Sequence, residues 1–203
     1  MTHYKDYGFP NADLSHAHQY LLPALLPMLH RQNKILDLGC GNGALTIKLI
    51  ELGFDVYGVD ASAEGIEIAK KYYPNRFFLQ DLSTGKLPEE LADTVFNTII
   101  STEVIEHLYD PEAFIQFCKA ILSNSNFAEL IISTPYHGYL KNLIIALFGK
   151  YDAHHSPTWS GGHIKFWSRN TLTSLLINEG FEMIIFRGCG RFPYLWKVVR
   201  IKL

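Results

Sequence analysis

One stretch constrains the fold of this chain more than any other: residues 35–43, where the apolar run Ile-Leu-Asp-Leu ends in three alternating glycines. Such a short apolar run before glycines is typical of a buried parallel strand. The glycines permit positive φ and leave no Cβ on the loop surface, so a flat ligand can lie against the backbone. The helix expected from Ala44 would direct its free N–H groups at that ligand. The stretch therefore predicts a strand, a ligand cradle and a helix.

The glycine loop alone leaves two cofactor classes open. With Ala44 as the third small residue it satisfies the dinucleotide pattern G-x-G-x-x-G/A. It also fits S-adenosylmethionine (AdoMet), for which an acidic residue precedes the first of three alternating glycines by two positions. Asp37 favours AdoMet, because a carboxylate here would face the positively charged methionine end and would repel a pyrophosphate. The predicted cradle consists of Gly39, Cys40, Gly41 and Gly43.

Length and composition narrow the class of protein. The 203 residues suit one domain, 1–203, with a sizeable core, and leave no room for a separate substrate domain. A net charge of −2 provides no field that would attract nucleic acid. The three widely separated cysteines exclude a complete disulfide framework and a CxxC metal site, and the longest apolar run, 143–148, is too short to span a bilayer. We therefore expect a soluble, cytoplasmic protein.

Strand and helix patterns alternate along the chain. Strands are expected at 35–38, 54–59, 76–80, 95–101, 128–133, 181–186 and 194–201, and helices at 13–31, 44–52, 63–72, 111–122 and 171–179. This alternation requires parallel strands with right-handed crossovers, and hence a three-layer α/β sandwich. Pro23 and Pro27 predict a bent or interrupted first helix, which Asp13 or Ser15 would cap.

Acidic residues follow two further strands. Asp60 ends the second strand, 21 residues past Gly39, where a carboxylate accepts both ribose hydroxyls of an adenosine. The alternative is that Asp60 caps the helix at 63–72. Asp81 follows the third strand, where its side chain could accept from the exocyclic amine of adenine. Ala61 and Leu82, beside these carboxylates, are included in the predicted cofactor site.

With the glycine loop, Asp60 and the phrase Glu-Val-Ile-Glu-His-Leu at 103–108, the chain resembles the class I AdoMet-dependent methyltransferases. Within them it is most similar to the ubiquinone-biosynthesis O-methyltransferase group, over roughly residues 30–186. The resemblance implies a doubly wound, Rossmann-like, seven-stranded sheet in which only the last strand is antiparallel. It also implies an AdoMet site lined by Asp37, Gly39, Gly41, Asp60, Asp81, Ser101, Thr102 and Glu103.

The phrase at 103–108 carries the candidate catalytic residues. Glu103, Glu106 and His107 would share one face if a helical turn follows the fourth strand, and the distant His163 could complete the site. Two interpretations remain open. In one, these four residues bind Mg²⁺ or Mn²⁺, with Zn²⁺ as a further option, and the cation lowers the pKa of an acceptor phenol. In the other, Glu106 and His107 order the loop, and one histidine acts as a metal-free general base.

Residues 136–167 form an insertion after the fifth strand, and insertions of this length usually carry function. We expect it to form a lid over the acceptor. Its apolar segment 139–148 is similar to the insertion with which the quinone enzymes meet isoprenoid substrates and membranes; the alternative is a buried helix. His154 and His155 lie in a polar stretch and are expected to be solvated.

These features together predict methyl transfer from AdoMet to a hydroxyl of a small, apolar or prenylated acceptor, with peripheral membrane contact through the lid helix. Two alternatives remain. The small-RNA 2′-O-methyltransferases have a similar Glu-x-x-Glu-His phrase, but the near-neutral charge counts against a nucleic-acid partner. A non-catalytic AdoMet-binding module would share the cradle and lack turnover.

Overall fold

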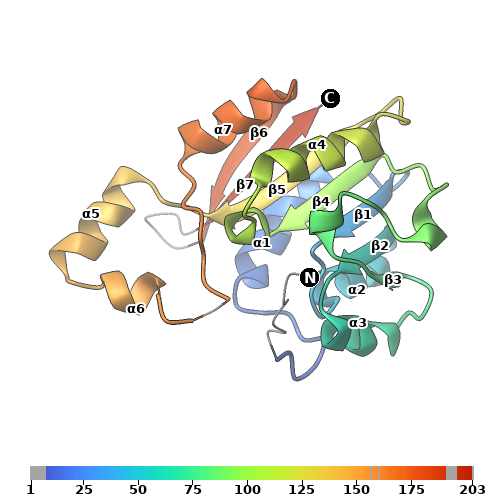
Figure 1. Cartoon of the computed structure of the whole chain (residues 1–203), viewed down its shortest axis with the longest axis horizontal. Coiled ribbons are helices and arrows are strands. Elements are labelled where there is room, and N and C mark those ends of the chain that lie inside the picture. The colour runs from blue at the N-terminus through green and yellow to red at the C-terminus, as the bar shows by residue number, and fades with distance from the viewer. Residues whose placement is uncertain (1–7, 156, 160, 191–195, 203) are drawn as a thin grey trace.

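A seven-stranded sheet forms the centre of the computed structural model, which describes residues 8–155, 157–159, 161–190 and 196–202 (Figure 1). Its strands are β1 Lys34–Leu38, β2 Asp55–Asp60, β3 Phe77–Leu79, β4 Thr98–Thr102, β5 Glu129–Pro135, β6 Glu182–Cys189 and β7 Trp196–Lys202. The order across the sheet is β3-β2-β1-β4-β5-β7-β6. β7 pairs antiparallel with β5 and β6, while β1 to β5 pair in parallel. The expected sheet with one antiparallel strand, the last, is confirmed.

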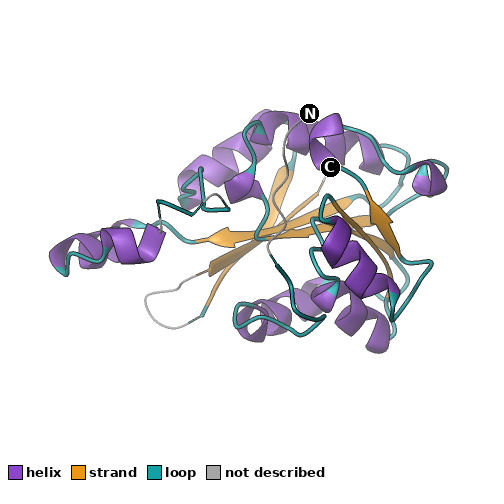
Figure 2. Ribbon diagram, turned by 60° about the horizontal axis from the view of Figure 1, so that its bottom comes forward, coloured by secondary structure: helices purple, strands orange, loops and turns teal. Residues whose placement is uncertain are grey.

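Helices cover both faces of this sheet, as the edge-on view in Figure 2 shows. They are α1 His18–Leu25, α2 Ala44–Glu51, α3 Ala63–Lys70, α4 Pro111–Leu122, α5 Tyr139–Leu147, α6 Tyr151–His155 and α7 Arg169–Asn178, with the 3₁₀ turns η1 Leu26–Met28, η2 Leu82–Thr84, η3 Glu89–Leu91 and η4 Ile105–His107. α1 and α2 share one core cluster, and α4 and α7 share another. The three-layer architecture follows from the strand–helix alternation.

The two core clusters meet at β1, which is buried on both sides. Leu36 and Leu38 pack in the cluster that contains α4 and α7, whereas Ile35 packs in the cluster with α1 and α2. Successive side chains of a strand point to opposite faces, so an unbroken apolar run is what a strand covered on both faces requires. The glycine loop therefore follows a strand that is covered on both faces of the sheet.

The N-terminal helix is shorter than predicted. α1 begins at His18 with Ala17 at its N-cap, and no side chain caps it, so the expectation that Asp13 or Ser15 would do so is wrong. The backbone N–H of Ser15 instead donates to Nδ1 of His18, at 2.9 Å. The predicted interruption is confirmed, since the α-helix ends at Leu25 and the 3₁₀ turn containing Pro27 follows.

Two other helix starts test the capping predictions. Asp110 caps the helix predicted at 111–122, α4, by accepting from the N–H of Ala113 at 2.9 Å, with Pro111 at the first helical position. Ser62 caps α3 by accepting from the N–H of Gly65 at 2.9 Å. The alternative interpretation of Asp60 as that cap is therefore wrong.

The segment after β5 extends away from the central sheet. α5 and α6 project from the sheet as an arm in both views (Figures 1 and 2). Within α5 only Lys141 is buried, so the alternative of a buried apolar helix is wrong. The strand predicted at 194–201 is observed as β7, while residues 191–195 lie outside the described part of the chain.

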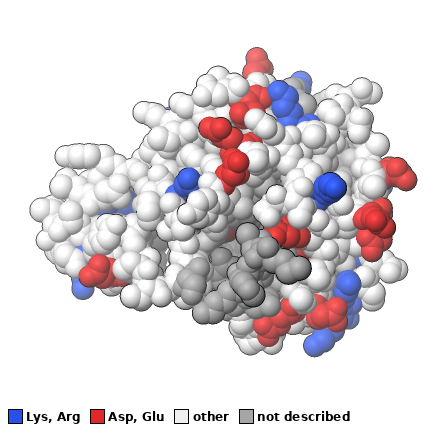
Figure 3. Space-filling model, viewed as in Figure 1, with Lys and Arg blue, Asp and Glu red and all other residues white. Residues whose placement is uncertain are grey.

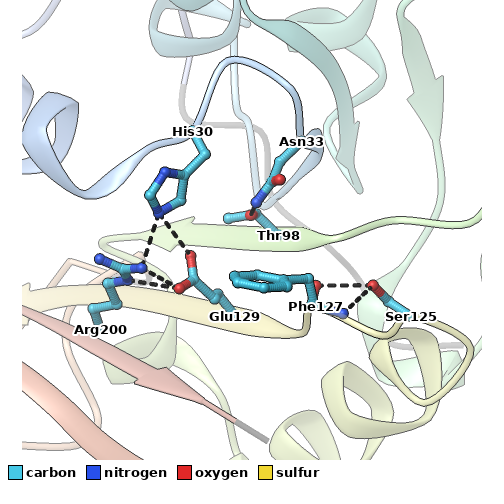
Figure 4. Close-up of polar contacts among 7 residues, drawn as sticks. All are labelled: His30, Asn33, Thr98, Ser125, Phe127, Glu129 and Arg200. Carbon is cyan, nitrogen blue, oxygen red and sulfur yellow. Dashed lines mark hydrogen bonds and ion pairs between the residues drawn. The ribbon is translucent and has the colours of Figure 1, made fainter.

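A buried polar cluster joins the antiparallel pair β5 and β7 to the loop before β1 (Figure 4). Glu129 of β5 is only 2% exposed. The guanidinium of Arg200, on β7, donates to Oε1 of Glu129, with Nε at 3.0 Å. The same guanidinium lies 3.0 Å from Nε2 of His30. Nε2 of His30 also lies 3.9 Å from Oε2 of Glu129, so the three side chains form one group.

Substitution Glu129→Gln should lower the free energy of unfolding by about 3 kcal/mol, because Arg200 would remain largely buried without a counter-charge. Urea denaturation measures this. Glu51→Gln is the control, since its pair with Lys48 is solvent-exposed and should contribute less than about 0.5 kcal/mol. Equal effects of the two substitutions would show that the ion pair between Glu129 and Arg200 does not stabilise the pairing of β5 with β7.

Candidate active site

A cavity of about 880 Å³ opens at the carboxyl ends of β1, β2 and β4, a size typical of small-molecule sites. The chain passes from β1 to β2 on one side and returns to β4 on the other, so the cavity lies at the topological switch point of the sheet. Eleven of the predicted site residues line it: Asp37, Gly39, Cys40, Gly41, Asp60, Ala61, Asp81, Leu82, Thr102, Glu103 and His107.

Four predicted residues are not in the wall of this cavity: Gly43, Ser101, Glu106 and His163. Gly43 is the N-cap of α2. Ser101 is fully buried, and its hydroxyl donates to the carbonyl of Leu38 at 2.9 Å, which fixes the end of β1 against β4. Glu106 and His163 lie beside His107 and are described below.

The glycine loop is constrained by its protein neighbours. Gly39, Gly41 and Gly43 all have positive φ, between 55° and 86°. A Cβ on Gly39 would lie 2.3 Å from Cγ2 of Val104, and a Cβ on Gly43 would lie 2.6 Å from Cβ of Ala69. The glycines thus let the loop after β4 and helix α3 come close to β1, in addition to exposing backbone to a ligand.

Asp60 joins the ends of β2 and β1. Its Oδ2 accepts from the N–H of Gly41 and its Oδ1 from the N–H of Ser62, each at 2.7 Å. Each carboxylate oxygen has a second lone pair, so the group can still accept from a ligand. Asp81 also accepts a local backbone bond, from Ser83 at 2.9 Å.

Asp37 presents a buried acceptor beside the cavity. It is 1% exposed; Oδ2 accepts from the hydroxyl of Thr46 at 2.6 Å, and Oδ1 has no partner among the described residues. Burial raises the pKa of Asp37 to about 7, the Thr46 hydrogen bond opposes this, and the charge of Asp60 adds to it. A cationic ligand would supply the missing partner.

The loop after β4 holds two glutamates against β5. Glu103 is the one non-glycine residue of the described chain with positive φ, 58°, a strained conformation of the kind that concentrates at functional sites. It accepts from the hydroxyl of Ser133 at 2.8 Å, and Glu106 accepts from the hydroxyl of Thr134 at 2.9 Å. Burial, and then the charge of Glu103, raise the pKa of Glu106 well above its ordinary value. Its Oε1 has no partner within the described residues.

The segment that follows α6 brings a distant histidine to this loop. The N–H groups of Ile164 and Lys165 both donate to the carbonyl of Glu106 at 2.9 Å. The rings of His107 and His163 are 4.9 Å apart. One potential ligand atom from each of Glu106, His107 and His163 lies within 4.8 Å of the others.

The structure thus brings together three of the four predicted metal ligands. Glu103 is outside this group because it precedes the 3₁₀ turn η4 in a left-handed conformation. The expectation that a helical turn aligns Glu103 with Glu106 and His107 is therefore wrong. Burial lowers the pKa of both histidines, that of His163 to about 4 with a further contribution from His107, so both imidazoles are neutral at pH 7.

The N-terminal segment forms part of the cavity wall. None of its residues was among the predicted site residues. Phe9, Asn11, Asp13 and His18 all line the cavity. The side-chain amide of Asn42 donates to the carbonyl of Asn11 at 2.7 Å and ties this segment to the glycine loop. No spacing in the sequence indicates this contact, which joins residues 31 positions apart.

A family model described as a methyltransferase domain matches residues 10–184, and the chain therefore belongs to this family. The human mitochondrial ubiquinone biosynthesis O-methyltransferase is 34% identical over 156 residues, which are 74% of this chain and 42% of that protein. The chain thus spans less than half of that relative's length.

Solved structures share the fold. A Pyrococcus horikoshii protein aligns with a TM-score of 0.69 at 21% identity, covering 98% of this chain and 99% of that one. Magnesium protoporphyrin IX methyltransferase from Synechocystis, solved with bound S-adenosylhomocysteine, aligns with a TM-score of 0.64 at 19% identity, covering 90% of this chain and 80% of that one.

Substitution Gly39→Ala should destabilise the protein more than Gly149→Ala. Both glycines have positive φ, but a Cβ on Gly149 meets nothing within 4 Å, whereas one on Gly39 meets Val104. We expect about 1 kcal/mol for Gly149→Ala from backbone strain, and a further 1 to 3 kcal/mol, roughly, for Gly39→Ala from overpacking. Denaturant midpoints measure both. Equal losses would show that Val104 does not restrict this position.

Proposed function

We propose that this chain transfers a methyl group from AdoMet to a hydroxyl of a small, apolar acceptor. The observation that carries the proposal is that Asp37 and Asp60 at the glycine loop share one cavity with His107 of the loop after β4, whose ring lies 4.9 Å from that of His163. Membership of the methyltransferase domain family supports the reaction class, and the similarity to a ubiquinone biosynthesis O-methyltransferase supports a hydroxyl acceptor.

The residues at the loop fit AdoMet. Asp60 would accept from the ribose hydroxyls, because a carboxylate can accept more hydrogen bonds than the two from Gly41 and Ser62, and Asp81 with Leu82 would contact the adenine. The unpartnered oxygen of Asp37 would face the cationic methionine end, whose charge favours the carboxylate form. The backbone of Gly39 and Gly41 leaves space for close approach, with Cys40, Ala61 and Thr102 nearby. The two carboxylates would instead repel the pyrophosphate of a dinucleotide.

Bound AdoMet supplies an activated methyl group for an in-line displacement. The chain must then align the acceptor hydroxyl and remove its proton. A phenol with an ordinary pKa near ~10 needs such help at neutral pH. His107 suits this role better than His163, because it lines the cavity and is neutral, whereas a pKa of about 4 makes His163 the weaker base. Glu106, buried behind them, would orient the pair.

A cation also fits this end of the site. Glu106, His107 and His163 would hold Mg²⁺ or Mn²⁺, with Glu103 adjacent, because the buried Oε1 of Glu106 lacks a partner and the imidazoles are neutral. A bound cation would supply a Lewis acid that lowers the pKa of the acceptor. The metal-free alternative uses one of the histidines as the base.

We further propose that residues 136–167 form the acceptor lid. α5 and the turn after it expose Leu143, Ile144, Leu147 and Phe148, the last two at 72% and 71%. In Figure 3 the arm carries few charges on the face shown. Such an exposed apolar helix suits a prenyl tail or the surface of a membrane. Within the described ranges, no helix has the length and apolar character needed to cross a membrane.

Charge does not favour nucleic acid as the acceptor. Lysines and arginines in Figure 3 are scattered among acidic residues on the visible face, and the whole chain carries −2. RNA-binding surfaces usually present clustered basic residues. The small-molecule acceptor is therefore the better supported of the two.

AdoMet should bind with measurable heat in isothermal titration calorimetry, whereas NAD should not. Substitution Asp60→Asn should weaken AdoMet binding by about 1.5 to 3 kcal/mol, as expected for losing charge-assisted hydrogen bonds. Asp93→Asn is the control, because Asp93 is exposed and outside the cavity wall. NAD binding without AdoMet binding would contradict the proposal.

A further inference from the structure

A second group of histidines lies where the arm joins the body of the molecule. We propose that His137, His154 and His155 form a binding site for a divalent transition-metal ion such as Zn²⁺, separate from the group around Glu106. One ring nitrogen from each of these three histidines lies within 4.8 Å of the others. This site does not depend on the proposed methyl transfer.

The fold brings these residues together from two elements. His137 follows the end of β5, and its N–H donates to the carbonyl of Trp167 at 3.1 Å. His154 and His155 end α6. The rings of His154 and His155 are 4.8 Å apart, and that of His155 is stacked on His137 at 5.5 Å. Phe166 contacts His137 and His155 edge-on, at 5.0 and 4.9 Å, and forms an apolar wall.

His137 provides an independent reason to expect a ligand. His137 is 8% exposed, and its Nε2 is buried with no hydrogen-bond partner among the described residues. A buried polar atom without a partner is costly and rare in native proteins. A metal ion would satisfy such a nitrogen. His154 is exposed, so an ion can reach the site from solvent and keep a water ligand.

The ligand set selects the class of ion. Three neutral imidazoles suit Zn²⁺, Co²⁺, Ni²⁺ or Cu²⁺, whereas Mg²⁺ and Ca²⁺ prefer oxygen ligands. Zn–N distances of about 2.0 to 2.1 Å place tetrahedral ligand nitrogens roughly 3.4 Å apart. The present spread of up to 4.8 Å would therefore contract by at most about 1.4 Å.

One charged group opposes the ion. Lys141, the buried lysine of α5, is close enough for its charge to act on all three histidines, and the charge of Glu103 acts on Lys141 as a counter-charge. His163 is also near, but is neutral. Removing the Lys141 charge should therefore strengthen metal binding, which a merely structural histidine cluster would not show.

A metal ion held here would fix the end of α6 to the end of β5. Between these two ends lie α5 and the turn at Gly149, the exposed part of the arm. Binding would thus restrict the arm and protect it from proteolysis, because opening the arm would require loss of a ligand.

The test is titration of the metal-free full chain with Zn²⁺ by calorimetry, and with Co²⁺ by visible absorption, in excess Mg²⁺ to occupy any oxygen-rich site. We expect a Zn²⁺ binding event that His154→Gln or His155→Gln weakens roughly 100-fold or more, since losing a ligand should cost at least as much as losing an outer-shell partner. Lys141→Gln should strengthen the same event several-fold. His16→Gln, outside both histidine groups, should leave it unchanged.

Circular dichroism and AdoMet affinity establish that the variants are folded. Zn²⁺ should also slow tryptic cleavage at Lys150 in the wild type, and not in His154→Gln. The proposal is overturned if Zn²⁺ does not bind. It is equally overturned if His154→Gln and His155→Gln bind Zn²⁺ as the wild type does, or if only His163→Gln abolishes binding, because the ion would then belong to the Glu106 group.

Discussion

The close approach of the β4 loop to the glycine loop is the constraint on which the rest of the site depends. It requires a residue without Cβ at Gly39, because Val104 fills the space that a side chain would occupy. Asp60 holds the same loop from the other side through the N–H of Gly41. Next to this loop, Glu103 takes its strained conformation, and η4 places His107 in the cavity wall with Glu106 buried beside it. The cofactor cradle and the candidate catalytic group are therefore one packed unit.

Features set by short-range patterns were predictable from the sequence. The strand predicted at 35–38, the glycine loop and the helix predicted at 111–122 follow from neighbouring residues alone, and the structure contains all three. The place of Ser101 was not predictable in this way. Alternation along β4 does not reveal that its hydroxyl donates to the carbonyl of Leu38, because that contact joins residues 63 positions apart.

Long-range contacts also bring together the residues of the two histidine groups. His163 reaches His107 because the backbone of Ile164 and Lys165 pairs with the carbonyl of Glu106, which no periodicity encodes. The apolar run 139–148 was compatible with a buried or an exposed helix; the structure instead buries its lysine and exposes most of its apolar side chains. Burial is the main reason that the pKa of both His137 and His163 is lowered, and the charge of Lys141 lowers both further.

The most direct test of the account is methyl transfer itself. Full-length chain would be incubated with methyl-labelled AdoMet and either a phenol bearing a prenyl tail or the same phenol without the tail. The account predicts a labelled methyl ether and S-adenosylhomocysteine, formed faster from the prenylated phenol, with that advantage lost in Leu143→Glu/Ile144→Glu. A chain that binds AdoMet yet methylates neither phenol would contradict it.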